Sequence, residues 1–248
     1  MSATVSPAWL QLREPADAAA RSEELAARLA ERLGPGPHEI HDLGGGSGSM
    51  GRWLAPRLPG AQRWVVHDRD ERLLELAAPD GGTRRSDVTR LAPGDLAGAR
   101  AVTASALLDL LTREELDRML AACAGLPMLL ALSVTGRVGL TPAEPLDARV
   151  EAAFNEHQRR GGRLGPDAVG AVLDAVEAEV LARPSPWRLG AGDAGLIAEW
   201  LEGWVGAACE QEPALAAEAA GYRERRLAQA AAGELAVAVD HADLLVLP

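Results

Sequence analysis

The sequence predicts an α/β protein whose core is a doubly wound, mostly parallel sheet. Three observations support this prediction. Short apolar segments typical of buried strands alternate with segments of helical periodicity over residues 38–135. The first apolar segment runs directly into a glycine-rich turn at residues 44–48. The segment at residues 128–133 (MLLALS) is almost wholly apolar, which is typical of a strand covered on both faces in a parallel sheet.

The composition is compatible with one folded domain. The chain has 248 residues, 48% of them apolar, so it can bury a sizeable core, and we expect a single domain over residues 1–248. No apolar run approaches the ~20 residues that span a bilayer. The N-terminus lacks the basic and apolar regions of a secretory signal. We therefore expect a cytoplasmic protein without a membrane partner.

Charge and missing residue types exclude several functions. The formal net charge of -11 makes the chain an unfavourable partner for nucleic acid. The chain contains no lysine, which excludes a P-loop lysine and a Schiff-base lysine. Cys123 and Cys209 lack CxxC spacing, so we expect neither a disulfide framework nor a metal site. The oligomeric state is left open.

An N-terminal helix comes first, and strands and helices then alternate. Helical periodicity predicts one helix over residues 8–33, which Gly34-Pro35-Gly36-Pro37 ends. Strands are predicted at residues 38–43, 63–67, 84–88, 101–104 and 128–133. Helices are predicted from Ser49 to Pro56 or Pro59, over residues 71–78, and after the capping box of Thr112 and Glu115. This alternation predicts parallel strands joined by right-handed crossovers.

The pattern changes after residue 133. Residues 135–145 are polar and marked by glycine and proline, and they are predicted to form a loop. Helices are predicted at residues 148–160, at 166–178, from an Asp193 cap onward and at 213–231, with a strand at 180–182. Residues 235–248 (LAVAVDHADLLVLP) predict a last strand, either continuous or in two short segments about Asp240 and His241.

The first strand and its glycine turn carry the strongest indication of a ligand. Gly44, Gly46 and Gly48 follow the strand at every second position. Glycine lets the backbone adopt positive φ and lets a ligand lie directly on the main chain. A helix that begins near Ser49 would aim its free N–H groups at that ligand. The segment therefore predicts a nucleotide-type binding site.

Two classes of ligand fit this turn. Gly46, Gly48 and Gly51 match the G-x-G-x-x-G spacing of dinucleotide sites, which is a weak signal on its own. Asp42 with Gly44, Gly46 and Gly48 resembles the first motif of class I S-adenosylmethionine (SAM)-dependent methyltransferases. The carboxylate of Asp42 favours SAM, because it would repel a pyrophosphate but attract an ammonium or sulfonium group.

Further positions match the same family. Asp68 ends the second strand, where the family's acid binds both ribose hydroxyls, and a carboxylate suits that task because it only accepts hydrogen bonds. Asp87 resembles the family residue that reaches the adenine amino group. Ser105 follows the fourth strand in a segment that usually faces the ligand. The resemblance covers about residues 38–135.

The resemblance also implies an architecture. It implies a Rossmann-like, seven-stranded, mostly parallel sheet whose last strand is antiparallel, with an N-terminal helix and a helical insertion. Residues 1–36 would then form an N-terminal helical cap and residues 38–135 the SAM-binding core. Residues 136–248 would supply substrate-side helices and the last strands.

Residues for the acceptor side are predicted from the later helices. The segment FNEHQ places Asn155 and Gln158 three apart on one helix face, where they could bind substrate. His157 is a candidate catalytic base, since its ordinary pKa lies near neutrality. Arg137 follows the fifth strand at the ligand-binding edge and could pair with an anionic substrate group. A solvent-facing helix explains the same segment equally well.

These observations predict transfer of a methyl group from SAM to an O or N nucleophile of a small-molecule acceptor. The absence of an N-P-P-Y motif and the acidic charge favour a small molecule over nucleic acid. One alternative is an NAD(P)-dependent oxidoreductase, which would need a catalytic tyrosine or lysine. The chain has no lysine, and Tyr222 is its only tyrosine. Another alternative is a methyltransferase-like protein that binds ligand without turnover.

Overall fold

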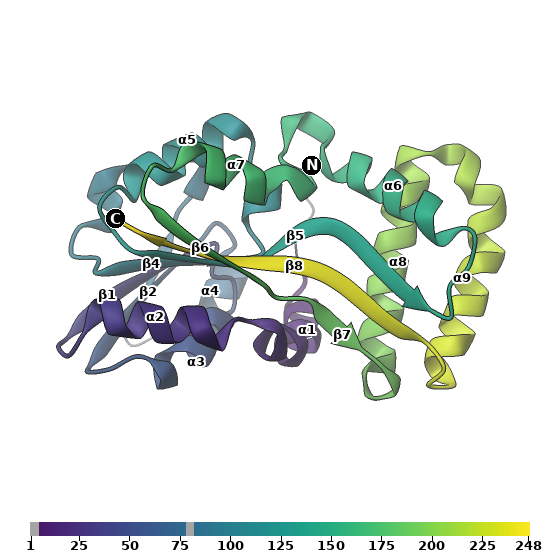
Figure 1. The fold of residues 1–248 in the computed structure, drawn as a ribbon, viewed down its shortest axis with the longest axis horizontal. Coiled ribbons are helices and arrows are strands. Elements are labelled where there is room, and N and C mark those ends of the chain that lie inside the picture. Colours follow the sequence, from purple (N-terminus) through teal and green to yellow (C-terminus); the bar gives the residue numbers. More distant parts are fainter. Residues whose placement is uncertain (1–4, 78–81) are drawn as a thin grey trace.

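A mixed sheet extends through the whole molecule in the computed structural model, which describes residues 5–77 and 82–248 (Figure 1). Ala78, the predicted end of a helix, lies outside the described residues. The strand order is β3-β2-β1-β4-β5-β8-β6, and the short β7 pairs with β8. The strands are β1 (His38–Leu43), β2 (Gln62–Asp68), β3 (Thr83–Arg85), β4 (Ala101–Ser105), β5 (Met128–Thr141), β6 (Glu179–Pro184), β7 (Trp187–Leu189) and β8 (Ala236–Leu247).

The pairing confirms the predicted mostly parallel sheet with an antiparallel last strand. β1 pairs in parallel with β2 and β4, and β3 and β5 continue the parallel set at its two sides. β8 runs antiparallel to β5, β6 and β7. The seven strands of the main path match the predicted number, and β7 adds an eighth strand beside β8.

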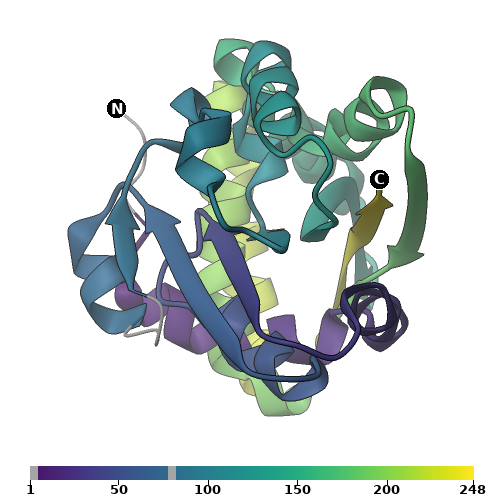
Figure 2. The same ribbon diagram turned by 90° about the vertical axis from the view of Figure 1, so that its left-hand side faces the viewer.

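Helices cover both faces of the sheet. In Figure 1, α2 and α3 lie below the strands and α5 and α7 lie above them. Figure 2, viewed from the end that carries β1 and β2, shows helices on both sides of the strands. The α-helices are α1 (Pro7–Ala20), α2 (Glu23–Leu33), α3 (Ser49–Leu54), α4 (Glu71–Ala77), α5 (Arg113–Ala122), α6 (Asp147–Gln158), α7 (Ala168–Ala175), α8 (Ala194–Gln211) and α9 (Ala216–Ala231).

Three apolar cores correspond to this arrangement. One core joins α2 and α3 to the sheet around Leu29 and Ile40, and a second joins α5 and α7 to the other face around Leu116 and Leu130. The third lies in an extension formed by α6, α8 and α9 with β7 and the far halves of β5 and β8, at the right of Figure 1. These side chains are withdrawn from water, so each layer is held mainly by the hydrophobic effect.

The N-terminal helix differs from its prediction. Residues 8–33 form two helices rather than one, because the backbone leaves helical geometry at Arg21 and Ser22. The Ser22 hydroxyl caps α2 by accepting from Leu25 N at 3.2 Å, and Ser22 N donates to the buried Asp243 Oδ2 at 2.8 Å. A cap and a buried acceptor therefore stabilise the break.

The predicted loop at residues 135–145 is also wrong over most of its length. β5 continues to Thr141, where it pairs with Ala236 at the start of β8. The register shifts between Val134 and Val138. The strand persists because β8 supplies hydrogen-bond partners and because Leu140 packs into the core of the extension. β8 is one continuous strand, so the option of two segments is wrong.

Candidate functional site

A cavity of about 700 Å³ opens at the carboxyl ends of β1, β2 and β4. Its lining comes from the turn after β1, the residues after β2, β3 and β4, helix α1 and Arg163. Ligands of open α/β sheets bind at this edge, and small-molecule sites commonly occupy ~300–1,000 Å³. Within the described ranges, no three His, Cys, Asp or Glu side chains are grouped closely enough to hold a metal ion.

The glycine turn forms one wall of the cavity. Gly44, Gly46 and Gly48 have φ of 62°, 54° and 80°, which L side chains rarely adopt. Gly44 and Gly46 line the cavity, whereas Gly48 is the N-cap of α3. Gly45 also lines the cavity and was not among the predicted residues. A Cβ atom at Gly45 would lie 2.4 Å from Asp42 Oδ2 and 2.8 Å from Val66 Cγ1.

Substitution of Gly45 by alanine is therefore expected to destabilise the fold by roughly 1–3 kcal/mol, since overpacking a rigid site costs that much. Gly203→Ala is the matched control. Gly203 lies inside α8, and outside the helix's own backbone no described atom lies within 4 Å of the position that a Cβ atom would take, so alanine should stabilise the helix by about 0.5–1 kcal/mol. Urea unfolding measures both. Equal stability of the two variants would contradict the close approach of Gly45 to Asp42.

Asp42 is completely buried beneath this turn. Its Oδ1 accepts a hydrogen bond of 2.7 Å from Thr103 Oγ1 on β4. Its Oδ2 has no hydrogen-bond partner among the described residues. Burial raises the pKa of Asp42 to about 6, although the Thr103 hydrogen bond and the charge of Arg21 oppose the shift. At neutral pH the carboxylate therefore places a negative charge directly under the cavity.

Asp68 ends β2 on the opposite side of the turn and lines the cavity. Its Oδ2 accepts a hydrogen bond of 3.0 Å from Gly46 N, and its Oδ1 accepts one of 2.9 Å from Asp70 N. The two backbone groups fix the carboxylate. Each carboxylate oxygen can accept a second hydrogen bond, so Asp68 can still bind a pair of hydroxyl groups.

Arg21 is a buried residue of the site that sequence reasoning missed. It lies at the break between α1 and α2 and is 3% exposed. Its Nη2 donates to Ser105 Oγ at 3.1 Å and to Ser49 Oγ at 3.3 Å, and both serines line the cavity. Burial lowers the pKa of Arg21, while Asp17, Asp42 and Asp243 oppose that shift. Arg21 Nε and Nη1 have no hydrogen-bond partner in the part of the chain that the structure describes, and the guanidinium lies 5.6 Å from the centre of the Trp53 ring.

Comparison with known proteins identifies the fold. No protein-family model matches the chain, and no curated protein sequence matches it. A candidate type II methyltransferase from Anaeromyxobacter dehalogenans superposes with a TM-score of 0.55 at 16% identity, covering 90% of this chain and 95% of that chain. A cyclopropane-fatty-acyl-phospholipid synthase-like protein from Lactobacillus casei superposes with a TM-score of 0.52 at 14% identity, covering 99% and 96%. The chain has a class I methyltransferase-like fold.

A third similar structure, of the mycolic acid cyclopropane synthase CmaA1, contains S-adenosylhomocysteine and CTAB. It superposes with a TM-score of 0.45 at 14% identity, covering 88% of this chain and 82% of that chain. No helix of the described ranges is both long and apolar enough to cross a bilayer.

In this methyltransferase-like fold, Asp87 also lines the cavity, after β3. Its Oδ1 accepts hydrogen bonds from Thr89 N at 3.0 Å and from Thr89 Oγ1 at 2.7 Å, which cap the short helix at Val88–Arg90. The Thr89 hydroxyl lowers the pKa of Asp87. The side chain is 49% exposed. Asp87 is thus a capping residue of the cavity lining, and its Oδ2 lies 3.9 Å from Arg90 Nε.

A buried pair of histidines lies next to Asp42 and Asp68 in the sheet. His41 Nδ1 and His67 Nε2 are 2.9 Å apart, and His67 Nδ1 lies 3.1 Å from Ser86 Oγ at the cavity. Burial lowers the pKa of His67 to about 4 and also lowers the pKa of His41. Both rings are therefore mainly neutral at pH 7. His41 Nε2 lies 3.0 Å from Glu39 Oε1, so the two rings connect Ser86 to the partly exposed carboxylate of Glu39.

The four residues predicted for the acceptor side do not line this cavity. Asn155 Nδ2 donates to Gly136 O at 2.8 Å, and His157 Nε2 lies 3.1 Å from Glu210 Oε2 at the surface. Gln158 is partly buried, and Arg137 is exposed on β5. Their roles in substrate binding and catalysis stay predictions. The lining of the cavity instead contains Trp9, Arg13 and Arg163.

Proposed function

We propose that the protein transfers a methyl group from SAM to an O or N nucleophile of a small-molecule acceptor. One observation carries this proposal: the glycine turn, Asp42 and Asp68 meet at a single cavity on the carboxyl edge of the sheet. The carboxylates of Asp42 and Asp68 lie on two sides of the turn, and their negative charges would repel the pyrophosphate of a dinucleotide. A ligand with positive charge and ribose hydroxyls suits the same surroundings.

The residues of the cavity fit SAM. The charge of Asp42 would stabilise the methionine ammonium and the sulfonium, and Asp68 would accept hydrogen bonds from the ribose. Asp87 lies at the position proposed for the adenine end, and Ser105 is held toward the cavity by Arg21. Gly44 and Gly46 would let the cofactor lie directly on the main chain, and Gly48 is the N-cap residue at which α3 begins.

Methyl transfer places modest demands on the protein. SAM supplies an activated methyl group on sulfur. The residues of the cavity have to bind both reactants, align them and exclude water, which is catalysis by proximity. The leading helix α1 supplies Trp9, Leu10 and Arg13 to the lining, and so separates part of the cavity from solvent.

The alternative of an oxidoreductase has less support. Tyr222, the only tyrosine of the chain, is completely buried in α9 and donates to Asp147 Oδ1 at 2.6 Å. It does not line the cavity. With no lysine in the chain, the usual tyrosine and lysine pair for hydride chemistry has no counterpart. We also propose a cytoplasmic location. The net charge of -11 supports a further part of the proposal, that the protein has no nucleic-acid partner.

The test is methyl transfer from isotope-labelled SAM to a panel of phenols, organic acids and amines, followed by mass spectrometry. We expect acceptor-dependent formation of S-adenosylhomocysteine. Binding of SAM without turnover on any member of the panel would favour the non-catalytic alternative. Reduction of NAD(P) with no binding of SAM would favour an oxidoreductase and overturn the proposal.

A further inference from the structure

Large apolar side chains form part of the cavity lining. They are Val5, Trp9 and Leu10 from the N-terminal segment, and Leu110 and Leu111 after β4. Val5 and Leu110 are 40% and 48% exposed, which is high for large apolar side chains. Exposed apolar groups gathered at one cavity usually mark a surface that a ligand covers.

Charged groups of this lining are mostly neutralised by partners. Arg13 forms an ion pair with Asp17, with Nε 2.9 Å from Oδ2, and its guanidinium lies 4.9 Å from the centre of the Trp187 ring. Arg72 pairs with Asp70 at 2.8 Å. These arginines therefore already have carboxylates and offer little net charge to a ligand.

Arg163 differs from them. Its Nε donates to the carbonyl oxygen of Arg160 at 2.9 Å. Within residues 5–77 and 82–248, no carboxylate lies within ion-pair distance of its guanidinium. Arg163 therefore adds to the cavity lining a positive charge that has no ion-pair partner among the described residues. A guanidinium with free Nη groups matches the planar, bidentate geometry of an oxyanion.

The backbone around Arg163 is fastened beside the apolar lining. Arg163 forms an antiparallel bridge with Thr112, and Leu164 N donates to Leu111 O at 2.8 Å. Gly165 follows with φ of 53°, and a Cβ atom there would lie 3.0 Å from Gln158 Cβ. Arg163 thus stands next to Leu111 on a fixed segment rather than on a free loop.

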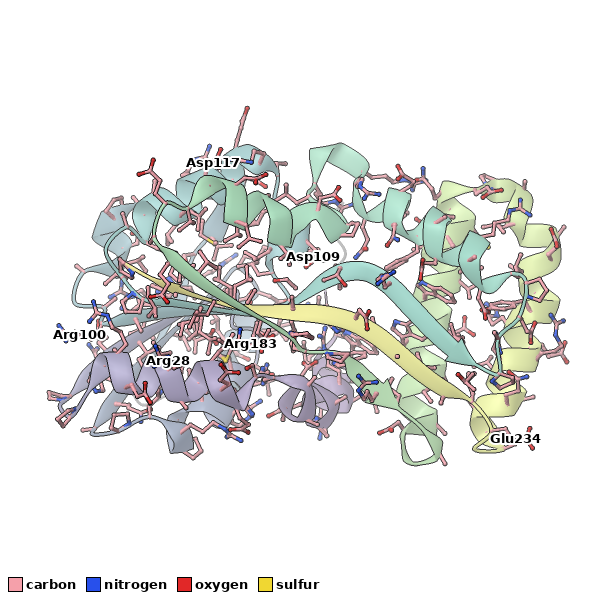
Figure 3. The ribbon with its side chains drawn as sticks, viewed as in Figure 1. Arg28, Arg100, Asp109, Asp117, Arg183 and Glu234 are labelled. Carbon is pink, nitrogen blue, oxygen red and sulfur yellow. The ribbon has the colours of Figure 1, made fainter. Side chains whose placement is uncertain are left out.

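Asp109 is the acidic group that acts on Arg163 at longer range. Figure 3 shows Asp109 in the middle of the view, whereas Asp117 and Glu234 lie at its periphery. Burial raises the pKa of Asp109, and the charges of Arg13 and Arg163 oppose that shift. Because Asp109 forms no ion pair with Arg163, it leaves the guanidinium open to an external anion.

We propose that the methyl acceptor is an oxyacid with an apolar body. Its carboxylate or phosphate would bind Arg163, and its body would cover Trp9, Leu110 and Leu111. This inference rests on the proposed methyl transfer, because it assigns the acceptor half of the same cavity. It also explains why the apolar lining is exposed and why one arginine has no acidic partner among the described residues.

The test compares matched acids and amides on protein saturated with S-adenosylhomocysteine. Binding of phenylacetate, indole-3-acetate and octanoate, and of their neutral amides, is measured by calorimetry, with phenyl phosphate as the phosphate arm. We expect the acids to bind roughly tenfold or more tightly than the amides, as charge-assisted hydrogen bonds to arginine imply. The carboxylate and phosphate arms show which oxyanion is preferred.

Arg163→Gln should reduce this preference to about threefold or less, and Arg163→Lys should retain part of it. Arg160→Gln is the matched control, because the Arg160 side chain binds Gln211 and does not line the cavity. Equal binding of acids and amides, no binding of any acid, or a preference unchanged in Arg163→Gln would overturn the inference. Binding of S-adenosylhomocysteine is measured first in the same sample. If S-adenosylhomocysteine does not bind, the proposed function fails. Titrations of the acids in the absence of S-adenosylhomocysteine then still decide whether Arg163 binds oxyanions.

Discussion

Replacing Asp68 with alanine is expected to weaken SAM binding by a factor of about 100 or more. Asp68 can accept hydrogen bonds from two hydroxyl groups, and each hydrogen bond to a charged group contributes ~1.5–3 kcal/mol. The substitution also removes the acceptors of Gly46 N and Asp70 N, so the glycine turn loses part of its support. Calorimetry with S-adenosylhomocysteine measures the loss.

Two further variants separate binding from folding. Asp68→Asn keeps one carbonyl oxygen and removes the charge, so we expect an intermediate affinity. Asp117→Ala is the control, because Asp117 lies on α5 with half of its side chain exposed and pairs only with Arg113 among the described residues. It should bind S-adenosylhomocysteine as the unsubstituted protein does. A loss of less than threefold in Asp68→Ala would contradict the ribose assignment.

Replacing Asp42 with asparagine is expected to weaken SAM binding at pH 8 and to change how stability depends on pH. The folded pKa of Asp42, about 6, lies above the ordinary value of 3.8. The folded state therefore binds more protons than the unfolded state between these values. The protonated form stabilises the fold at low pH, and this contribution is lost as the pH rises through 6.

The expected change is measurable. Relative to Asp42→Asn, the unsubstituted protein should lose roughly 1–1.5 kcal/mol of unfolding free energy between pH 5 and pH 8. SAM affinity of the unsubstituted protein should fall below pH 6, where the carboxylate becomes neutral, and that of the asparagine variant should not. Urea unfolding and calorimetry at both pH values test this. A stability difference that is independent of pH would show that Asp42 is not a buried acid with a raised pKa.

The meeting of the residues proposed to bind the cofactor could be predicted from sequence, because each is close in the chain to the element that positions it. Asp42 and Asp68 lie at the ends of β1 and β2, and parallel strands bring their carboxyl ends to one edge. The glycine turn can be identified from its local sequence alone, without knowledge of residues far away in the chain. The fold class followed from the same alternation of strands and helices.

Other features depend on contacts between residues that are far apart in sequence. The break in the N-terminal helix needs Asp243, 221 positions from Ser22. The second half of β5 is polar in places and becomes a strand because β8 pairs with it. Arg21 carries no local motif, since its importance comes from the buried position between Ser49 and Ser105.

The contacts of the residues proposed for the acceptor side could not be predicted for a similar reason. Helical spacing puts Asn155 and Gln158 on one helix face, but it cannot show which neighbour that face contacts. The structure places Asn155 against Gly136 and His157 beside Glu210. Arg163 reaches the cavity because its segment is bridged to Thr112, a pairing across 51 positions that no sequence pattern indicates.

Binding of SAM at the cavity by Asp42, Asp68 and the glycine turn can be tested by a calorimetric titration. The unsubstituted protein is titrated with S-adenosylhomocysteine and, separately, with NAD. We expect one site per chain for S-adenosylhomocysteine and no binding of NAD at the same concentrations. Binding of NAD without binding of S-adenosylhomocysteine would contradict this expectation.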